Sequence, residues 1–180
     1  MISKAIGLGN PNAKLVFYIR NRPPLTFYQS LTSVRPLVAG DIAHIGRETG
    51  NHWRKIFNVY AKLLFELAPN NFPTWQYLRD NALLQTQSDH CILFSAPKLS
   101  SVISAEVAAN KKLHIVLGKG YAEQLGFNND CTWLSNDFAI IPKFGVIICP
   151  YFDYRQLSNK KISQLTGLIQ KLINGQEASI

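Results

Sequence analysis

The chain has 180 residues, which fits one domain, and 47% of them are hydrophobic, enough for a core without disulfides or a structural metal. No run of about 18 apolar residues occurs, which argues against a membrane partner or span. The first residues lack the apolar stretch of a secretory signal, and three scattered cysteines do not make a disulfide framework. We therefore expect a cytoplasmic protein that folds as a single domain over residues 1–180.

The net charge of +8 is concentrated at the start of the chain. Residues 1–62 carry nine Lys and Arg side chains but two acidic ones, whereas residues 63–180 carry ten basic and nine acidic ones. Such asymmetry favours a polyanionic partner, DNA or RNA. The alternative is a charge that only keeps the protein soluble.

The first half of the chain predicts one strand and two helices. Residues 1–13 are rich in Gly and Asn, and we expect them to be irregular. β-Branched and aromatic residues predict a strand over 14–20, which the prolines at 23 and 24 end. Apolar residues at helical spacing predict a helix from about Thr49 to Leu67, capped by Thr49 or Asn51, and a second helix follows over 73–84. Residues 25–40 show no clear pattern.

In the second half, strands and helices alternate. Strands are predicted over 90–95, 113–117, 138–141 and 146–149, and the last two leave open whether they form a hairpin. Helices are predicted over 100–110, within 118–125, and from a Ser158 cap to about Ile173. The alternation predicts an α/β protein with three layers, α/β/α, around a four- or five-stranded, mostly parallel sheet.

Ligands of such folds bind at the loops that follow the carboxyl ends of the parallel strands. Those loops are 21–25, 95–99, 118–121 and 150–157. Gly118-Lys119-Gly120 lacks the upstream glycine and the Ser/Thr of a P-loop, so we do not expect nucleotide hydrolysis. This turn could still bind a phosphate, or it could be only a tight turn between a strand and a helix.

Two short segments carry side chains suited to nucleic acid. The loop Pro150-Tyr-Phe-Asp-Tyr-Arg155 joins aromatic rings to an arginine, a combination that stacks on bases, although the rings could instead pack on the sheet. Its Asp153 could accept a proton or pair with Arg155. Gly50-Asn-His-Trp-Arg-Lys55 places polar side chains at a helix start, where they could hold a phosphate or form a solvated first turn. The candidate nucleic-acid-binding residues are Arg20, Asn21, Arg22, His52, Arg54, Lys55, Lys119, Tyr151, Phe152, Asp153, Tyr154 and Arg155.

No pattern of metal ligands, cofactor binding or a catalytic nucleophile is visible. No two of the four histidines lie three or four residues apart, and no Gly-x-Ser-x-Gly motif occurs. His114 lies within an apolar strand and is expected to be a satisfied interior or edge residue. Gly7 and Gly9 form a lone pair of glycines, which fails as a dinucleotide fingerprint. We therefore expect no metal and no cofactor.

Residues 15–24, Leu-Val-Phe-Tyr-Ile-Arg-Asn-Arg-Pro-Pro, end a strand in a proline turn, and Trp75 lies on a helix before the strand at 92–94. Together with the order of elements over 14–173, this resembles the uracil-DNA glycosylase superfamily. In that family the first strand ends in Gly-Gln-Asp-Pro-Tyr, whose aspartate activates water; here Arg20 stands at the glycine and Arg22 at the aspartate. The family's last strand ends in His-Pro-Ser-Pro-Leu-Ser, whereas residues 150–158 keep Leu157-Ser158 but no histidine.

The resemblance implies a shared scaffold with a DNA-facing basic surface but without the two chemical groups that base excision needs. The leading hypothesis is therefore a non-catalytic or degenerate glycosylase-like protein that binds nucleic acid. Arginines and lysines would contact phosphates, and Tyr151, Phe152 and Tyr154 would stack on bases. The alternatives are an enzyme that binds a small anionic or nucleotide ligand at the carboxyl edge of the sheet, and a protein–protein adaptor.

Overall fold

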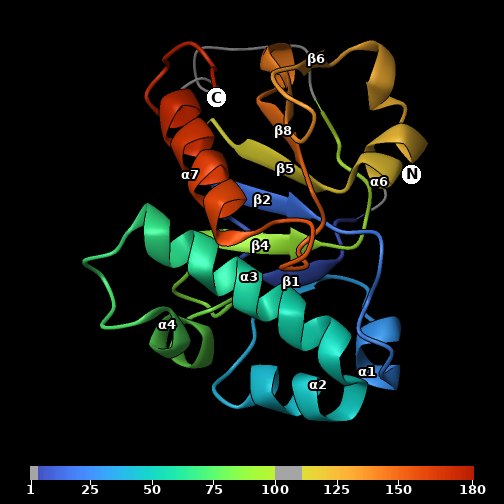
Figure 1. Ribbon diagram of the computed structural model, residues 1–180. Coiled ribbons are helices and arrows are strands. Elements are labelled where there is room, and N and C mark those ends of the chain that lie inside the picture. Colours follow the sequence, from blue (N-terminus) through green and yellow to red (C-terminus); the bar gives the residue numbers. More distant parts are fainter. Residues whose placement is uncertain (1–3, 100–110) are drawn as a thin grey trace.

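The structure, a computed structural model, describes residues 4–99 and 111–180 (Figure 1). These residues build one eight-stranded sheet in the order β3-β1-β4-β2-β5-β8-β7-β6. Its four central strands run parallel to one another. They are β4 (His90–Leu93), β2 (Leu15–Tyr18), β5 (Leu113–Leu117) and β8 (Val146–Cys149). The predicted α/β class and mostly parallel sheet are confirmed, and these four strands lie where the sequence predicts them.

The predicted count of four or five strands is wrong, because short strands extend the sheet on both sides. On one side β1 (Gly7–Gly9) runs antiparallel to β4 and pairs with β3 (Val34–Arg35). On the other side β7 (Ala139–Ile141) runs antiparallel to β8 and pairs with β6 (Thr132–Trp133). A 3-10 turn, η2 (Pro142–Phe144), joins β7 to β8, so these two strands form a hairpin. β7 lies within the strand predicted over 138–141, whereas β1, β3 and β6 were not predicted. These three strands have only two or three residues each, too few to show an alternating pattern.

The glycine pair at 7 and 9 lies in β1, which corrects the expectation that residues 1–13 are irregular. A Cβ atom at Gly7 would lie 2.8 Å from Leu93 Cα, and one at Gly9 would lie 2.8 Å from Cys91 Cα. Gly9 also has a φ of +112°, which a side chain disfavours. The two glycines therefore let β1 approach β4 closely.

Helices cover both faces of the sheet, which gives the three predicted layers. On one face lie α3 (Asn51–Leu67) and α7 (Asn159–Ile173), with α2 (Asp41–Thr49) and α4 (Trp75–Asn81) packed against α3 (Figure 1). The opposite face contacts α6 (Lys119–Gln124), which buries Ala122 there. Strand residues alternate between the faces: Phe17 packs on the α3 side and Tyr18 on the α6 side. The predicted helix over 100–110 lies outside the described residues.

The helix ends differ from the sequence predictions in their caps. Gly50, with a φ of +77°, separates α2 from α3, and neither Thr49 nor Asn51 caps α3 with its side chain. Ser158 is at the N-cap of α7, but its hydroxyl makes no capping hydrogen bond. Two shorter elements, α1 (Thr26–Gln29) and η1 (Phe127–Asn129), lie in connections. In the described part of the chain, no helix combines the length and apolar character needed to cross a membrane.

Replacing Gly7 with alanine should lower the free energy of unfolding by about 1–3 kcal/mol, because the added methyl group forces β1 away from β4. Urea unfolding followed by circular dichroism measures this change. The control is Gly120→Ala, since a Cβ atom at Gly120 in α6 has no neighbour within 4 Å. That variant should keep or slightly raise the stability, as alanine favours a helix. Equal stability of both variants would contradict the close-approach explanation.

Candidate functional site

The parallel strands place four loops at one edge of the sheet. Arg20 and Asn21 follow β2, Ser95 follows β4, Gly118 follows β5 and Tyr151 follows β8. The amino-terminal end of α3 lies at the same edge, near the arrowheads of β2 and β4 (Figure 1). The loops that the sequence analysis selected by topology therefore do share one edge, which we call the carboxyl edge.

Tyr151 joins side chains from three of these elements. Its hydroxyl accepts a hydrogen bond from Asn21 Nδ2 at 3.4 Å and lies 2.9 Å from His52 Nε2. The Tyr151 and His52 rings also stack, with centroids 5.8 Å apart and planes 22° apart. Burial raises the pKa of Tyr151, against smaller opposing effects of the Asn21 hydrogen bond and the Arg20 charge. The hydroxyl therefore keeps its proton at neutral pH and can donate a hydrogen bond to His52.

A second group of side chains surrounds Tyr154, whose side chain is 54% exposed. Lys55 Nζ lies 5.0 Å from the centre of the Tyr154 ring and 3.4 Å from Asp153 Oδ2. The Arg155 guanidinium lies 5.7 Å from the same ring. Tyr154 is thus an exposed aromatic ring with two cations beside it. Because Lys55 lies one helical turn after His52, this group adjoins the Tyr151 group.

Asp153 holds the loop in place. Its Oδ1 accepts the Arg155 backbone N–H at 2.9 Å, which is the largest cause of a lowered Asp153 pKa, and Lys55 lowers that pKa further. A carboxylate that stays ionised and bonded in this way is a poor proton acceptor at neutral pH. The structure therefore favours the pairing role for Asp153, with the backbone of Arg155 and the side chain of Lys55 as partners.

Lys119 extends the surface on the other side of Tyr151. Its Nζ lies 4.8 Å from the centre of the Trp133 ring, and Trp133 is 42% exposed. The preceding Gly118 faces Tyr151, since a Cβ atom there would lie 3.9 Å from Tyr151 Cδ2. Trp133 was missed by sequence reasoning because it lies in a two-residue edge strand, β6, with no motif around it.

Arg20, Asn21 and His52 also line an open hollow of about 580 Å³. Its other lining residues are Arg22, Pro24, Gln29 and Trp53, so no carboxylate lines it. The three ion pairs among the described residues do not include Arg20. The first turn of α3 at this edge has no side-chain cap, which adds a further positive end charge. The hollow is therefore electropositive and suited to an anion.

Two predicted residues, Phe152 and Arg22, have other roles. Phe152 is fully buried against Phe17 and Tyr60, with ring centroids 5.8 and 5.5 Å away, so the prediction that it stacks on bases is wrong. Arg22 Nη1 lies 2.9–3.3 Å from the carbonyl oxygens of three residues that follow it, and its guanidinium lies over Phe94 at 5.7 Å. Those carbonyls belong to Tyr28, Gln29 and Leu31.

Arg54 lies on a different side of α3 from Tyr151. Its aliphatic chain covers Gly46 of α2, and its side chain lines a separate hollow that includes Arg79 and Asp80. Helical geometry explains the separation, since Arg54 is two residues from His52 and residues so spaced do not share a face. The prediction that Arg54 acts together with His52 rests on their closeness in the chain, and the structure separates them.

Two of the histidines, His90 and His114, lie on central strands of the sheet. His114 is half-buried on β5 and its Nδ1 lies 2.7 Å from the Tyr18 hydroxyl, so the expectation that its ring is satisfied by a hydrogen bond is confirmed. Burial lowers the pKa of His114 to about 4 and that of His90 to about 3. Both imidazoles are therefore neutral in the folded protein at neutral pH. Within the described ranges, no three His, Cys, Asp or Glu side chains gather where they could hold a metal ion.

The three cysteines are free thiols, as their scatter predicts. Cys91 and Cys149 are buried in strands, and burial raises the pKa of Cys91 to about 12 and raises that of Cys149 as well. Both thiols are therefore protonated and unreactive at neutral pH.

Comparisons with known proteins give one match. The sequence model of a family of unknown function, DUF6942, matches residues 6–170, which includes every residue of the carboxyl edge named above. No curated protein and no solved structure matches the chain.

The free energy of unfolding should fall as the pH is lowered from about 6.5 toward 4. The unfolded state protonates its histidines near pH 6.5, whereas the folded state resists protonation of His90 and His114 until about pH 3 and 4. Each imidazole contributes a slope of up to about 1.4 kcal/mol per pH unit in that window. Urea unfolding at half-unit pH steps measures it, and His114→Gln should reduce the slope above pH 5 to about half. A flat profile between pH 6.5 and 5 would contradict the expectation.

Proposed function

We propose that this chain, which belongs to the family of unknown function DUF6942, binds single-stranded nucleic acid along the carboxyl edge of its sheet. The observation that carries the proposal is a pair of exposed aromatic rings with lysines and arginines beside them, on either side of the Tyr151 group. One ring is Tyr154, beside Lys55 and Arg155, and the other is Trp133, beside Lys119.

The aromatic rings support single strands as the ligand. Bases of an unpaired strand expose their faces, and proteins bind them by stacking on aromatic and guanidinium groups. Tyr154 and Trp133 are 54% and 42% exposed, so each can accept a base without a change in the core. In a duplex the same faces are stacked on each other and cannot reach these rings.

The charges support a phosphodiester backbone between the two rings. Neighbouring residues connect the surface: Lys119 follows Gly118, Gly118 faces Tyr151, and Tyr151 forms hydrogen bonds with His52 and Asn21. Arg20 lies beside them, exposed and outside the ion pairs of the described residues. A strand crossing this surface would meet cations at Lys119, Arg20 and Arg155. Such contacts position the ligand without reading its sequence.

The proposal includes no bond cleavage. Arg22, which stands where the glycosylase resemblance has its water-activating aspartate, is engaged with three backbone carbonyls and carries a positive charge. The resemblance to the uracil-DNA glycosylases remains a prediction. The alternative is that a mononucleotide binds in the hollow lined by Arg20, Asn21 and His52. Displacement of a labelled oligonucleotide by mononucleotides distinguishes the two ligands.

Removing the Arg20 charge should weaken binding and lower its salt dependence. Fluorescence anisotropy with labelled single-stranded DNA and RNA at several salt concentrations gives both quantities. For Arg20→Gln the slope of log affinity against log salt should shrink by about 0.7, the value for one phosphate of a single strand. Lys14→Gln is the matched control, because Lys14 is an exposed cation before the opposite end of β2. Absence of any binding at low salt, or displacement by mononucleotides at equal concentration, would overturn the proposal.

Removing the Tyr154 ring should weaken binding through lost stacking while leaving the salt slope unchanged. The expected loss for Tyr154→Ala is about 1–3 kcal/mol in the same anisotropy assay. Tyr77→Ala is the control, since Tyr77 is 50% exposed but lies on α4, away from the carboxyl edge. If both tyrosine variants bind like the unchanged protein, bases do not stack on Tyr154.

A further inference from the structure

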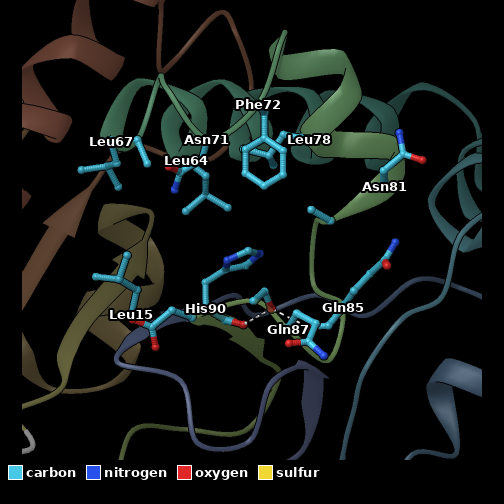
Figure 2. A pocket seen from close by; sticks show the side chains of 14 residues that line it. Leu15, Leu64, Leu67, Asn71, Phe72, Leu78, Asn81, Gln85, Gln87 and His90 are labelled. Carbon is cyan, nitrogen blue, oxygen red and sulfur yellow. Dashed lines mark hydrogen bonds between the residues drawn. The ribbon is translucent and has the colours of Figure 1, made fainter.

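A cavity of about 440 Å³ lies at the other end of the molecule (Figure 2). It is lined by the first residues of β2 and β4, by the carboxyl-terminal end of α3 and by α4 with the segment after it. This is the amino edge of the parallel strands, so the cavity shares no residue with the carboxyl-edge surface. Its volume is within the range of cavities that bind small molecules.

The lining is mainly apolar, but it includes the largely buried imidazole ring of His90. Its large apolar side chains come from α3, α4, the loop between them and β2, and they are Leu15, Leu64, Leu67, Phe72 and Leu78. Figure 2 shows the imidazole of His90 reaching from β4 into the space below Leu64 and Phe72. His90 is only 8% exposed, although histidine is a polar residue that usually has both ring nitrogens bonded when buried.

Hydrogen bonding determines which nitrogen of His90 carries its proton. Nε2 accepts the backbone N–H of Leu84 at 2.9 Å, and a backbone amide can only donate. Nε2 is therefore unprotonated, and the neutral ring holds its proton on Nδ1. Among the described residues, Nδ1 forms no hydrogen bond with another protein group. His90 thus offers a fixed N–H donor without a protein acceptor, on the wall of an apolar cavity.

The backbone that supplies this bond is strained. Leu84 has a φ of +58° and is the one non-glycine residue with positive φ in the described part of the chain. It is fully buried, and its carbonyl accepts the Leu37 N–H at 2.8 Å. A leucine disfavours this left-handed conformation, because its Cβ crowds the following carbonyl oxygen. The Leu84 backbone nevertheless adopts this conformation, in which its N–H donates to His90 and its carbonyl accepts from Leu37.

The charges around the cavity favour a neutral ligand. No lysine or arginine lines it, and its one charged lining residue is the carboxylate of Asp89. The remaining polar lining groups include the side-chain amides of Asn71, Asn81, Gln85 and Gln87. Burial lowers the pKa of His90 to about 3, so the ring carries no charge that could pair with an anion. An anionic ligand would meet a carboxylate without a balancing cation.

We propose that this cavity binds an uncharged, largely apolar small molecule, which accepts the His90 Nδ1–H hydrogen bond through a carbonyl oxygen. The apolar body of the molecule packs between Leu64, Leu67 and Phe72, and its carbonyl reaches His90. The cavity lies apart from the proposed nucleic-acid surface, because the two lie at opposite edges of the sheet and share no residue.

The test uses prodan, an uncharged naphthyl ketone whose fluorescence shifts to shorter wavelength in apolar surroundings. Titration of the full chain should give saturable, blue-shifted emission. Phe72→Ala removes a wall of the cavity and should weaken prodan binding about tenfold. Phe65→Ala is the matched control, since Phe65 is also a half-buried phenylalanine but lines a different hollow. Its prodan affinity should stay within about twofold of the unchanged protein.

A second measurement reports on His90 without any substitution. Long-range nitrogen–proton NMR spectra of histidine-labelled protein distinguish the two neutral tautomers. The expected spectrum at pH 7 shows His90 with its proton on Nδ1, and prodan should shift the Nδ1–H signal. The proposal is overturned if prodan gives no saturable emission, if Phe72→Ala and Phe65→Ala lose equal affinity, or if the Nδ1–H signal stays unchanged at saturating prodan.

Discussion

Parallel pairing of four strands is the constraint on which the rest of this structure depends. Because β4, β2, β5 and β8 all run in one direction, their carboxyl ends lie at one edge and their amino ends at the other. Polar and cationic residues follow the carboxyl ends, whereas the amino ends of β2 and β4 contribute Leu15 and His90 to a mainly apolar cavity. The direction of the strands thus separates two different kinds of surface.

The helix α3 contributes to both surfaces. Its 17 residues span about 25 Å, which is longer than the central strands beneath it, since these have four or five residues at about 3.3 Å each. Its first two turns supply His52 and Lys55 to the carboxyl edge, and its last turns supply Leu64 and Leu67 to the cavity. Between them Tyr60 is fully buried and contacts both Phe152 of the loop after β8 and the His90 ring, with centroids 5.5 and 5.4 Å away. The same aromatic packing therefore holds both sites in position.

Elements with a strong local pattern were predicted correctly. Elements whose conformation depends on contact with another segment were missed. β5 was predicted to the residue because four of its five residues are apolar, a composition that suits a strand covered on both faces. β1 was missed because Gly7-Leu8-Gly9 is a strand only by virtue of its close contact with β4. At the carboxyl edge, Tyr151, His52 and Asn21 were selected from separate segments, and the structure brings them together. Phe152 was selected with its neighbours, although consecutive residues of a loop point in different directions.

By itself the sequence determined the α/β class, the central strands, the helices α3, α4, α6 and α7 but not α2, and the uneven positive charge, because periodicity and composition are local quantities. Only the tertiary structure decided which charges gather on one surface. Arg54 and Arg22 are close in sequence to carboxyl-edge residues, yet one packs over α2 and the other bonds backbone carbonyls. Tertiary structure also decided the state of His90, whose proton position follows from the Leu84 backbone bond. These properties depend on contacts between segments that no local pattern records.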